Sequence, residues 1–409
     1  MSPSSEVLPL KPESPVNTRI RRVVAFIFLL GVFFPFVRVT PLETDVQPLA
    51  LVFSVLFILC VKNWRLPVSV SLLFVPVFFL PLILWLGGFN FDGVRGAMSY
   101  ISLFCISAAS YFLIRDRIVW SENFLKSVIC IWCGVALIQI LGDREFLSFL
   151  LPRVSTTAGR GVVSLAPEPT FYGIIILFFG FFLFVEKKLS WFWTLVILGQ
   201  ILILARSSMV ALFLLILGSV YLFFSLSLRL LVWTTLLLGS GIWILFTFYE
   251  QELTGSRLYM LFQLALKSPI LIVTQDESGN DRFLHIFFSV LGFFDNYGLP
   301  HGFSRFVQYM SEKMGEYHAL VLNLTKGDRI MSGYGAALFE MGFIGLFIPV
   351  AVGLTLWQYF HQSRRLRVTF VVFFSIIMFS AIQLSFPPLG FMVGYLAAKT
   401  VMENEGHHV

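Results

Sequence analysis

Long apolar runs alternate with short polar connections along almost the whole chain, and this pattern predicts its elements. A run of roughly 20 mainly apolar residues is long enough to cross a bilayer as a helix. Runs of this kind lie at 22–38, 46–61, 67–86, 96–114, 124–142, 170–186, 189–205, 208–226, 230–249, 335–359, 368–384 and 387–402. The pattern therefore predicts an all-α polytopic membrane protein with about twelve transmembrane helices.

Polar stretches divide this pattern into regions. Residues 1–18 are rich in serine and proline and predict a disordered cytoplasmic tail. Residues 19–402 form one polytopic membrane domain, and 403–409 a short second tail. Two longer polar loops interrupt the domain, at 143–169 and 250–334. Within the longer loop, the amphipathic stretches 258–273 and 283–294 predict short helices.

Composition supports the membrane class. Hydrophobic residues make up 57% and charged residues 13% of the 409 positions, and the mean hydropathy is +0.86. A soluble domain carries about a quarter charged residues, so a soluble enzyme is excluded. The four cysteines lie inside apolar runs, where packing explains them better than a disulfide or a metal site. We therefore expect no metal and no cofactor.

The short connections predict an orientation, because lysine and arginine favour the cytoplasmic side of a membrane. With the N-terminus inside, every inner connection is basic, including 19–22, 62–65, 115–117, 186–188 and 364–367. The alternation holds through all the predicted spans. Both termini are therefore expected in the cytoplasm, and the loops 143–169 and 250–334 on the outer face.

The outer face should be poor in basic residues, yet it is rich in arginine. Its arginines are Arg38, Arg95, Arg144, Arg153, Arg160, Arg206, Arg257, Arg282, Arg305 and Arg329. Long outer loops escape the charge rule, and their arginines can pair with carboxylates. That explanation does not cover Arg206, which stands nearly alone between two apolar runs. Arginine binds phosphate oxygens bidentately, so the pattern predicts an anionic, membrane-borne ligand on the outer side.

Two residues are candidates for a general base. Glu168 lies between Pro167 and Pro169 at the start of a predicted span, where it can serve as a helix N-terminal partner or form a salt bridge to Arg160. Alternatively, Glu168 orients or deprotonates an acceptor hydroxyl. His318 in the long loop is the second candidate. The loop histidines lack metal-ligand spacing, and a surface or hydrogen-bonded role is the simpler interpretation for each.

Several motifs occur in an order that resembles a known family. These are Pro-Glu-Pro-Thr-Phe-Tyr-Gly at 167–173, Ala-Arg-Ser-Ser at 205–208, Arg282 followed by Pro-His-Gly at 300–302, and Glu340-x-Gly342-x-x-Gly345. In this order they resemble the Wzy-type O-antigen and exopolysaccharide polymerases of the O-antigen ligase/polymerase superfamily. The resemblance covers roughly residues 140–350.

The resemblance implies a metal-independent glycosyltransferase with a GT-C-like helical bundle in the bacterial inner membrane. Its substrates would be polyprenyl-pyrophosphate-linked glycans, joined on the outer face, among membrane lipids and with a chain-length regulator protein as a further candidate partner. No nucleic acid is implied. Arg160, Arg206 and Arg282 match the positions that hold the pyrophosphate. The loop arginines Arg153, Arg257 and Arg305 are additional candidates for that role.

Two other functions fit parts of the pattern. Ligase-type members, which transfer glycan to lipid A–core or protein, commonly carry a His-Asn pair where this chain has Met331-Ser332. That departure favours a polymerase over a ligase. A transporter or flippase of lipid-linked oligosaccharide would also use outer arginines, but it should carry charged residues within its spans, and these spans are nearly free of them.

Overall fold

The computed structural model describes residues 15–40, 44–87, 90–118, 120–155, 161–225, 277–317 and 330–406, with single positions at 260, 263, 264, 267, 268, 271 and 320. Within these residues every regular element is a helix, and no strand occurs. The all-α prediction is confirmed. The predicted run 230–249 and most of the amphipathic stretch 258–273 lie outside the described residues.

The predicted apolar runs coincide with helices wherever the structure describes them. Unbroken helices are α1 (Pro15–Phe33), α2 (Leu49–Leu59), α5 (Phe91–Arg115), α6 (Glu122–Leu141), α7 (Pro169–Val185), α9 (Ser208–Ser225), α18 (Arg364–Ser380) and α19 (Pro387–Asn404). Helix α1 begins within the predicted disordered tail, because proline suits a first turn, where its missing N–H has no helical partner.

The helices are those of a multi-pass membrane protein. Among the described residues, five helical segments are long and apolar enough to cross a membrane. These segments are Val68–Trp85, Phe91–Arg115, Glu122–Leu141, Ser208–Ser225 and Gly333–Tyr359, and the shorter apolar helices are Leu49–Leu59, Pro169–Val185 and Trp191–Ala205. The count of twelve spans stays a prediction.

Three predicted runs are broken helices. The first divides into α3 (Val68–Leu72) and α4 (Phe74–Gly87), because the ring of Pro76 crowds the carbonyl four residues earlier. The second is α8 (Trp191–Gly199), which continues as the π-helix η2 (Gln200–Ala205). The third comprises α16 (Gly333–Met341), the 3₁₀-helix η4 (Gly342–Leu346) and α17 (Phe347–Tyr359). Gly342 begins η4 with φ +58°, a conformation that favours glycine.

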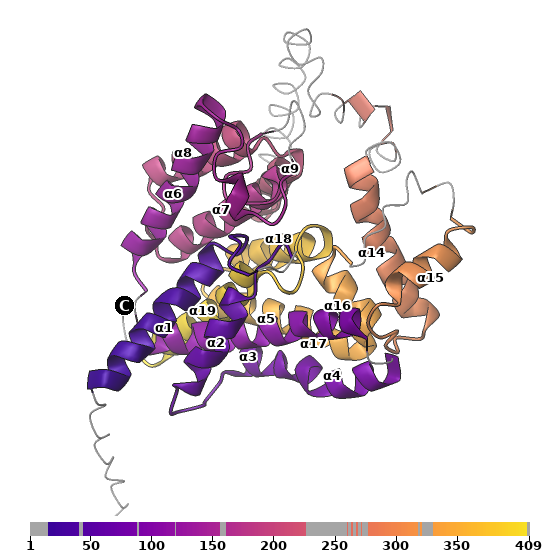
Figure 1. The fold of residues 1–409 in the computed structure, drawn as a ribbon, viewed down its shortest axis with the longest axis horizontal. Helices are drawn as coiled ribbons and strands as arrows, with labels where there is room; N and C mark the ends of the chain where they lie inside the picture. Colours follow the sequence, from indigo (N-terminus) through magenta and orange to yellow (C-terminus); the bar gives the residue numbers. More distant parts are fainter. Residues whose placement is uncertain are drawn as a thin grey trace, which may run out of the picture.

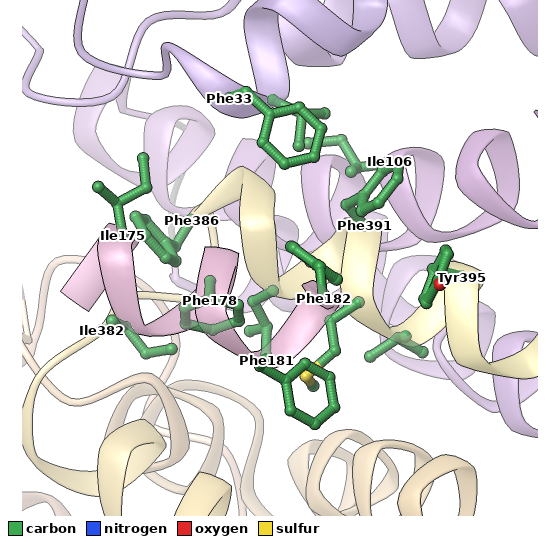
Figure 2. Close-up of a cluster of buried hydrophobic side chains, with 14 of the residues drawn as sticks. Phe33, Ile106, Ile175, Phe178, Phe181, Phe182, Ile382, Phe386, Phe391 and Tyr395 are labelled. Carbon is green, nitrogen blue, oxygen red and sulfur yellow. The ribbon is translucent and has the colours of Figure 1, made fainter. Parts of the chain in front are cut away.

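Helix α7 lies at the centre of the bundle. It is apolar and buried on nearly every side, as expected of a helix without a polar face. Figure 2 shows Phe178, Phe181 and Phe182 of α7 together with Phe391 and Tyr395 of α19. The rings of Phe182 and Phe391 lie 5.3 Å apart, edge to face. Such aromatic pairs add to the stability that burial of the rings supplies.

Part of the long polar loop forms a small unit of its own. Helix α14 (Glu277–Asp295) contains the predicted amphipathic stretch 283–294, which is thereby confirmed as helical. With α15 (Phe306–Lys313) and α16 it encloses a separate apolar cluster around Phe288 and Phe339. In Figure 1, α14 and α15 lie together beside α16, on the other side of the molecule from α6 and α8.

Polar residues of the connections predicted to be cytoplasmic make contacts with residues of other helices. Arg21 of α1 pairs with Asp116 at the end of α5. Glu186, at the end of α7, accepts a hydrogen bond of 2.8 Å from the indole N–H of Trp120 and pairs with Lys399 of α19 at 3.1 Å. We call this group the inner-end cluster. Arg21 and Asp116 join α1 to the end of α5, and Glu186 and Lys399 join the end of α7 to α19.

Candidate functional site

The loop before α7 lies directly on the junction between η2 and α9. The backbone N–H of Val162 donates a hydrogen bond of 2.9 Å to the carbonyl oxygen of Leu204. A Cβ added at Gly161 would lie 2.1 Å from the carbonyl oxygen of Ala205, so only glycine fits there. This contact brings the start of the described loop, beside position 160, against the residue that precedes Arg206.

The start of α7 contacts the same junction. The hydroxyls of Thr170 and Ser207 lie 3.1 Å apart, and the Tyr172 hydroxyl donates to Oε1 of Gln200 at 2.9 Å. The motifs 167–173 and 205–208 are therefore parts of one structure. We call the polar residues at this place the arginine lip, and its members are Asp45, Arg153, Glu168, Thr170, Arg206 and Ser207.

Within the arginine lip, a bidentate ion pair holds Arg153. Its Nε and an Nη lie 2.6 and 2.8 Å from the two carboxylate oxygens of Asp45, and the same Nη lies 3.5 Å from Glu168. Hydrogen bonding to Asp45 raises the pKa of Arg153. Because Asp45 neutralises its charge, Arg153 is better suited to positioning Glu168 than to binding a phosphate group.

Glu168 sits at the lip as the sequence indicates, with a different partner. It is the N-cap residue of α7 in extended conformation, φ −146°, as expected of a residue before proline. Its carboxylate makes no capping hydrogen bond to the helix, so it is not an N-terminal helix partner in that sense. Instead it pairs with Arg153. The alternative partner, Arg160, lies outside the described residues.

Arg206 occupies an unusual backbone position. It has left-handed dihedral angles, φ 46° and ψ 36°, and follows the π-helix η2. Left-handed dihedral angles are uncommon for a residue with a Cβ, and π-helices are rare. Both are frequent at functional sites. Its Nε donates to the carbonyl oxygen of Ile203 at 3.0 Å, and the side chain is exposed. Arg206 is thus an exposed arginine held at Nε by a backbone carbonyl, next in sequence to the buried Ser207.

The remaining predicted site residues do not belong to the arginine lip as described. Arg282 on α14 donates to the carbonyl oxygen of Ser380 at 3.3 Å, at the end of α18. Arg305 is exposed before α15 and pairs with Gln308 at 3.3 Å. Arg160, Arg257 and His318 lie outside the described residues.

A second polar site, which the sequence did not indicate as a unit, lies where α5, α16 and the end of α18 meet. A pocket of about 50 Å³ there is lined by Asp92, Arg95, Gly96, Ser99, Tyr100, Phe303, Ser304, Ile330, Ala336, Glu340, Gln383 and Leu384. We call it the polar pocket. The Tyr100 hydroxyl donates to Glu340 at 2.7 Å. The Nε of Arg95 is buried without a hydrogen-bond partner among the described residues.

The turn at 298–303 builds one wall of the polar pocket. The N–H groups of His301 and Gly302 donate to the carbonyl oxygens of Phe339 and Glu340 at 3.0 and 3.2 Å. The His301 ring stacks on Phe339 with centroids 4.2 Å apart. These contacts bring the ring of Phe303 against the ring of Tyr100, with the centroids 5.8 Å apart. The sequence shows Arg95 and Glu340 separately, but nothing in it shows that a turn joins them.

Histidines of the small α14 unit have structural roles. His285 is 2% exposed, and its Nδ1 accepts a hydrogen bond of 3.2 Å from the N–H of Met331. Burial, with a smaller effect of Arg282, lowers the pKa of His285 to about 4, so the ring is neutral at physiological pH. The Nε2 atom of His301 contacts the Gly292 carbonyl at 2.8 Å. The expectation of hydrogen-bonded histidines is confirmed for these two.

No group of three or more metal-ligating side chains occurs in the part of the chain that the structure describes. A scan against protein-family models found no match, and a search of curated proteins found no relative of this chain. The function is therefore inferred from the chain's own residues.

Proposed function

We propose that the protein is a polysaccharide polymerase that joins polyprenyl-pyrophosphate-linked oligosaccharide units on the outer face of the bacterial cytoplasmic membrane. The observation that carries the proposal is the arginine lip. Two segments separated in sequence pack together there: the loop and helix start that carry Arg153, Glu168 and Thr170, and the junction that carries Arg206 and Ser207. An exposed arginine beside hydroxyl donors and a carboxylate suits a reaction in which a phosphate group leaves and a hydroxyl attacks.

The membrane topology that we propose has about twelve spans and both termini in the cytoplasm, in a GT-C-like bundle. Two sets of contacts support it. In the inner-end cluster, Arg21, Asp116 and Glu186 belong to connections that the charge rule assigns to the cytoplasm. The arginine lip joins Asp45, Arg153 and Glu168, all of which the same rule assigns to the outer face. No contact within either group joins residues of opposite assignment.

The proposed reaction is a glycosyl transfer. A hydroxyl oxygen of the acceptor unit forms a bond to the anomeric carbon of the donor glycan. The bond between that carbon and the pyrophosphate oxygen breaks, and polyprenyl pyrophosphate leaves with the electron pair. The hydroxyl proton passes to a base, for which Glu168 and His318 are the candidates, with Glu168 preferred because it lies at the lip. The step needs no nucleotide and no redox partner.

The lip residues divide these tasks. Arg206, exposed next to Ser207 in the chain, meets the negative charge that develops on the pyrophosphate, and Arg160 is a further candidate for this role. Arg153 and Asp45 form a fixed pair that orients Glu168. Arg282, Arg257 and Arg305 remain candidates for contacts with the rest of the lipid-linked unit.

The proposal is tested with purified protein in liposomes, supplied with lipid-linked repeat units extracted from cells that lack the gene. Wild type should produce a ladder of polymers. Arg206→Ala should abolish the ladder, and Arg206→Lys should restore it poorly, since lysine keeps the charge but loses the bidentate fork. Arg365→Ala, an exposed arginine at the start of α18, is the matched control and should leave the ladder unchanged.

Glu168→Gln separates binding from chemistry in the same assay. This variant keeps the shape of the side chain but cannot accept a proton, so it should bind the lipid-linked donor yet build no polymer. Normal ladders from both Arg206→Ala and Glu168→Gln would overturn the assignment of the arginine lip. Transfer of single units to lipid A–core, without a ladder, would identify a ligase instead.

A further inference from the structure

We propose that the polar pocket is a sugar subsite, which binds the hydroxyl-bearing edge of one uncharged or amino sugar ring of the lipid-linked glycan. The identification of the glycan rests on the proposed function. The binding of a sugar ring rests on the pocket itself, which is lined by residues other than those of the arginine lip.

The chemistry of the pocket matches a sugar better than a phosphate. Its lining offers carboxylates from Asp92 and Glu340, a guanidinium group from Arg95, and an amide from Gln383. Each hydroxyl of a sugar donates one hydrogen bond and accepts others, so a site for it must present both acceptors and donors. Carboxylates accept, guanidinium donates, and an amide does both. The ring of Phe303 adds an apolar face on the same wall.

The charged groups that line the pocket favour a sugar over another pyrophosphate. Among the lining residues, Asp92 and Glu340 supply two carboxylates, whereas Arg95 supplies a single guanidinium group. Carboxylates accept hydrogen bonds from sugar hydroxyls or an amino group but repel the oxygens of a pyrophosphate. The arginine lip has the opposite character, since Arg206 is exposed beside hydroxyl groups.

Size sets the extent of the ligand. The pocket holds about 50 Å³, and one water needs roughly 10–15 Å³ by the same kind of measure. The pocket therefore has room for about three to five waters. The hydroxyl groups along one edge of a single sugar ring take up a similar space. A disaccharide does not fit inside, so the neighbouring sugars of a repeat unit must extend out of the pocket mouth.

Two features indicate that the pocket is prepared for a polar ligand. The Nε of Arg95 is buried without a partner among the described residues, and a buried donor of this kind costs free energy until a ligand satisfies it. Glu340 is held in place by the Tyr100 hydroxyl at 2.7 Å, and Tyr100 is itself 2% exposed. Tyr100 is thus a positioning residue, which acts on the ligand through the Glu340 carboxylate.

The test uses the full-length protein in detergent and the repeat-unit oligosaccharide released from its lipid by mild acid, which carries no phosphate. Binding is measured by ligand-observed NMR. Glu340→Gln and Arg95→Gln should each weaken binding about tenfold or more, because each removes a charge-assisted hydrogen bond. Glu312→Gln, an exposed carboxylate on α15, is the matched control and should bind as wild type does.

Tyr100→Phe tests the positioning role. The variant keeps the ring that packs on Phe303 but loses the hydroxyl that holds Glu340. It should weaken binding by less than Glu340→Gln does, and the double variant should bind no worse than Glu340→Gln alone, since both act through one carboxylate. Additive losses in the double variant would overturn this role. Melting temperatures of all variants in the same detergent confirm that they are folded.

Steady-state kinetics then assign the sugar to one substrate. A higher KM for the acceptor unit alone in Glu340→Gln assigns the pocket to the acceptor, and a higher KM for the donor alone assigns it to the donor. Unchanged oligosaccharide binding in both Glu340→Gln and Arg95→Gln would overturn the subsite, even if the protein polymerises. If the two variants bind the oligosaccharide more weakly but the wild-type protein has no polymerase activity, the subsite is supported and the proposed function fails.

Discussion

Substitution of Gly161 by alanine tests whether the contact between the loop at 161–162 and the junction at 204–205 matters. The Cβ that alanine adds would lie 2.1 Å from the carbonyl oxygen of Ala205 and 2.3 Å from that of Leu204. Real side chains do not approach backbone atoms this closely, and the backbone of η2 cannot rotate away as a side chain could. The loop at Gly161 and Val162 must therefore move off the junction.

The size of the effect follows from the contacts that the displaced loop loses. Crowding a packed site costs about 1–3 kcal/mol. Displacement also breaks the hydrogen bond from Val162 to Leu204, 2.9 Å long, which contributes about 1 kcal/mol. Gly161→Ala should therefore destabilise the protein by about 2–4 kcal/mol. Gly134→Ala is the matched control, since nothing lies within 4 Å of its added Cβ. In the middle of α6 that change should stabilise by about 0.5–1 kcal/mol.

Two assays measure the outcome. Thermal unfolding in detergent compares the stabilities of Gly161→Ala, Gly134→Ala and wild type. The liposome ladder assay compares their activities at a temperature where all three remain folded, so that lost activity reports the displaced loop. We expect Gly161→Ala to be less stable and to lose most polymerisation, and Gly134→Ala to retain both. Equal stability and activity of the two variants would refute the argument that the loop must lie against η2.

Two further predictions concern pH and topology. Because the pKa of His285 falls from 6.5 to about 4 on folding, the unfolded chain binds the proton first as the pH decreases. Stability should therefore be constant above pH 6.5 and fall by up to about 3 kcal/mol by pH 4. Thermal melts across this range should show the decrease, and His285→Gln should abolish it. A reporter that is active only outside the cytoplasm should work when fused after Asn280 and fail after Arg364, and the reverse pattern would contradict the proposed orientation.

The sequence determined the helical class and most helix positions. Apolar runs can satisfy their backbone groups in a membrane only as helices or closed barrels, so their length alone predicts helices. The sequence also indicated Glu168 and Arg206, because an ionisable residue stands out against an apolar background. Helix breaks were less visible. Pro76 indicates one of them, but the π-helix before Arg206 depends on packing against α7 and has no separate signal.

Only the tertiary structure decided which polar residues meet. Asp45 and Arg153 are 108 positions apart, and Tyr100 and Glu340 are 240 apart, so no local pattern could pair them. Hydrogen bonds and ion pairs depend on distances of about 3 Å, which are set by how the helices and turns pack. The sequence therefore shows which residues carry charged or hydroxyl groups, and the packing of distant helices decides which of them meet in the arginine lip and in the polar pocket.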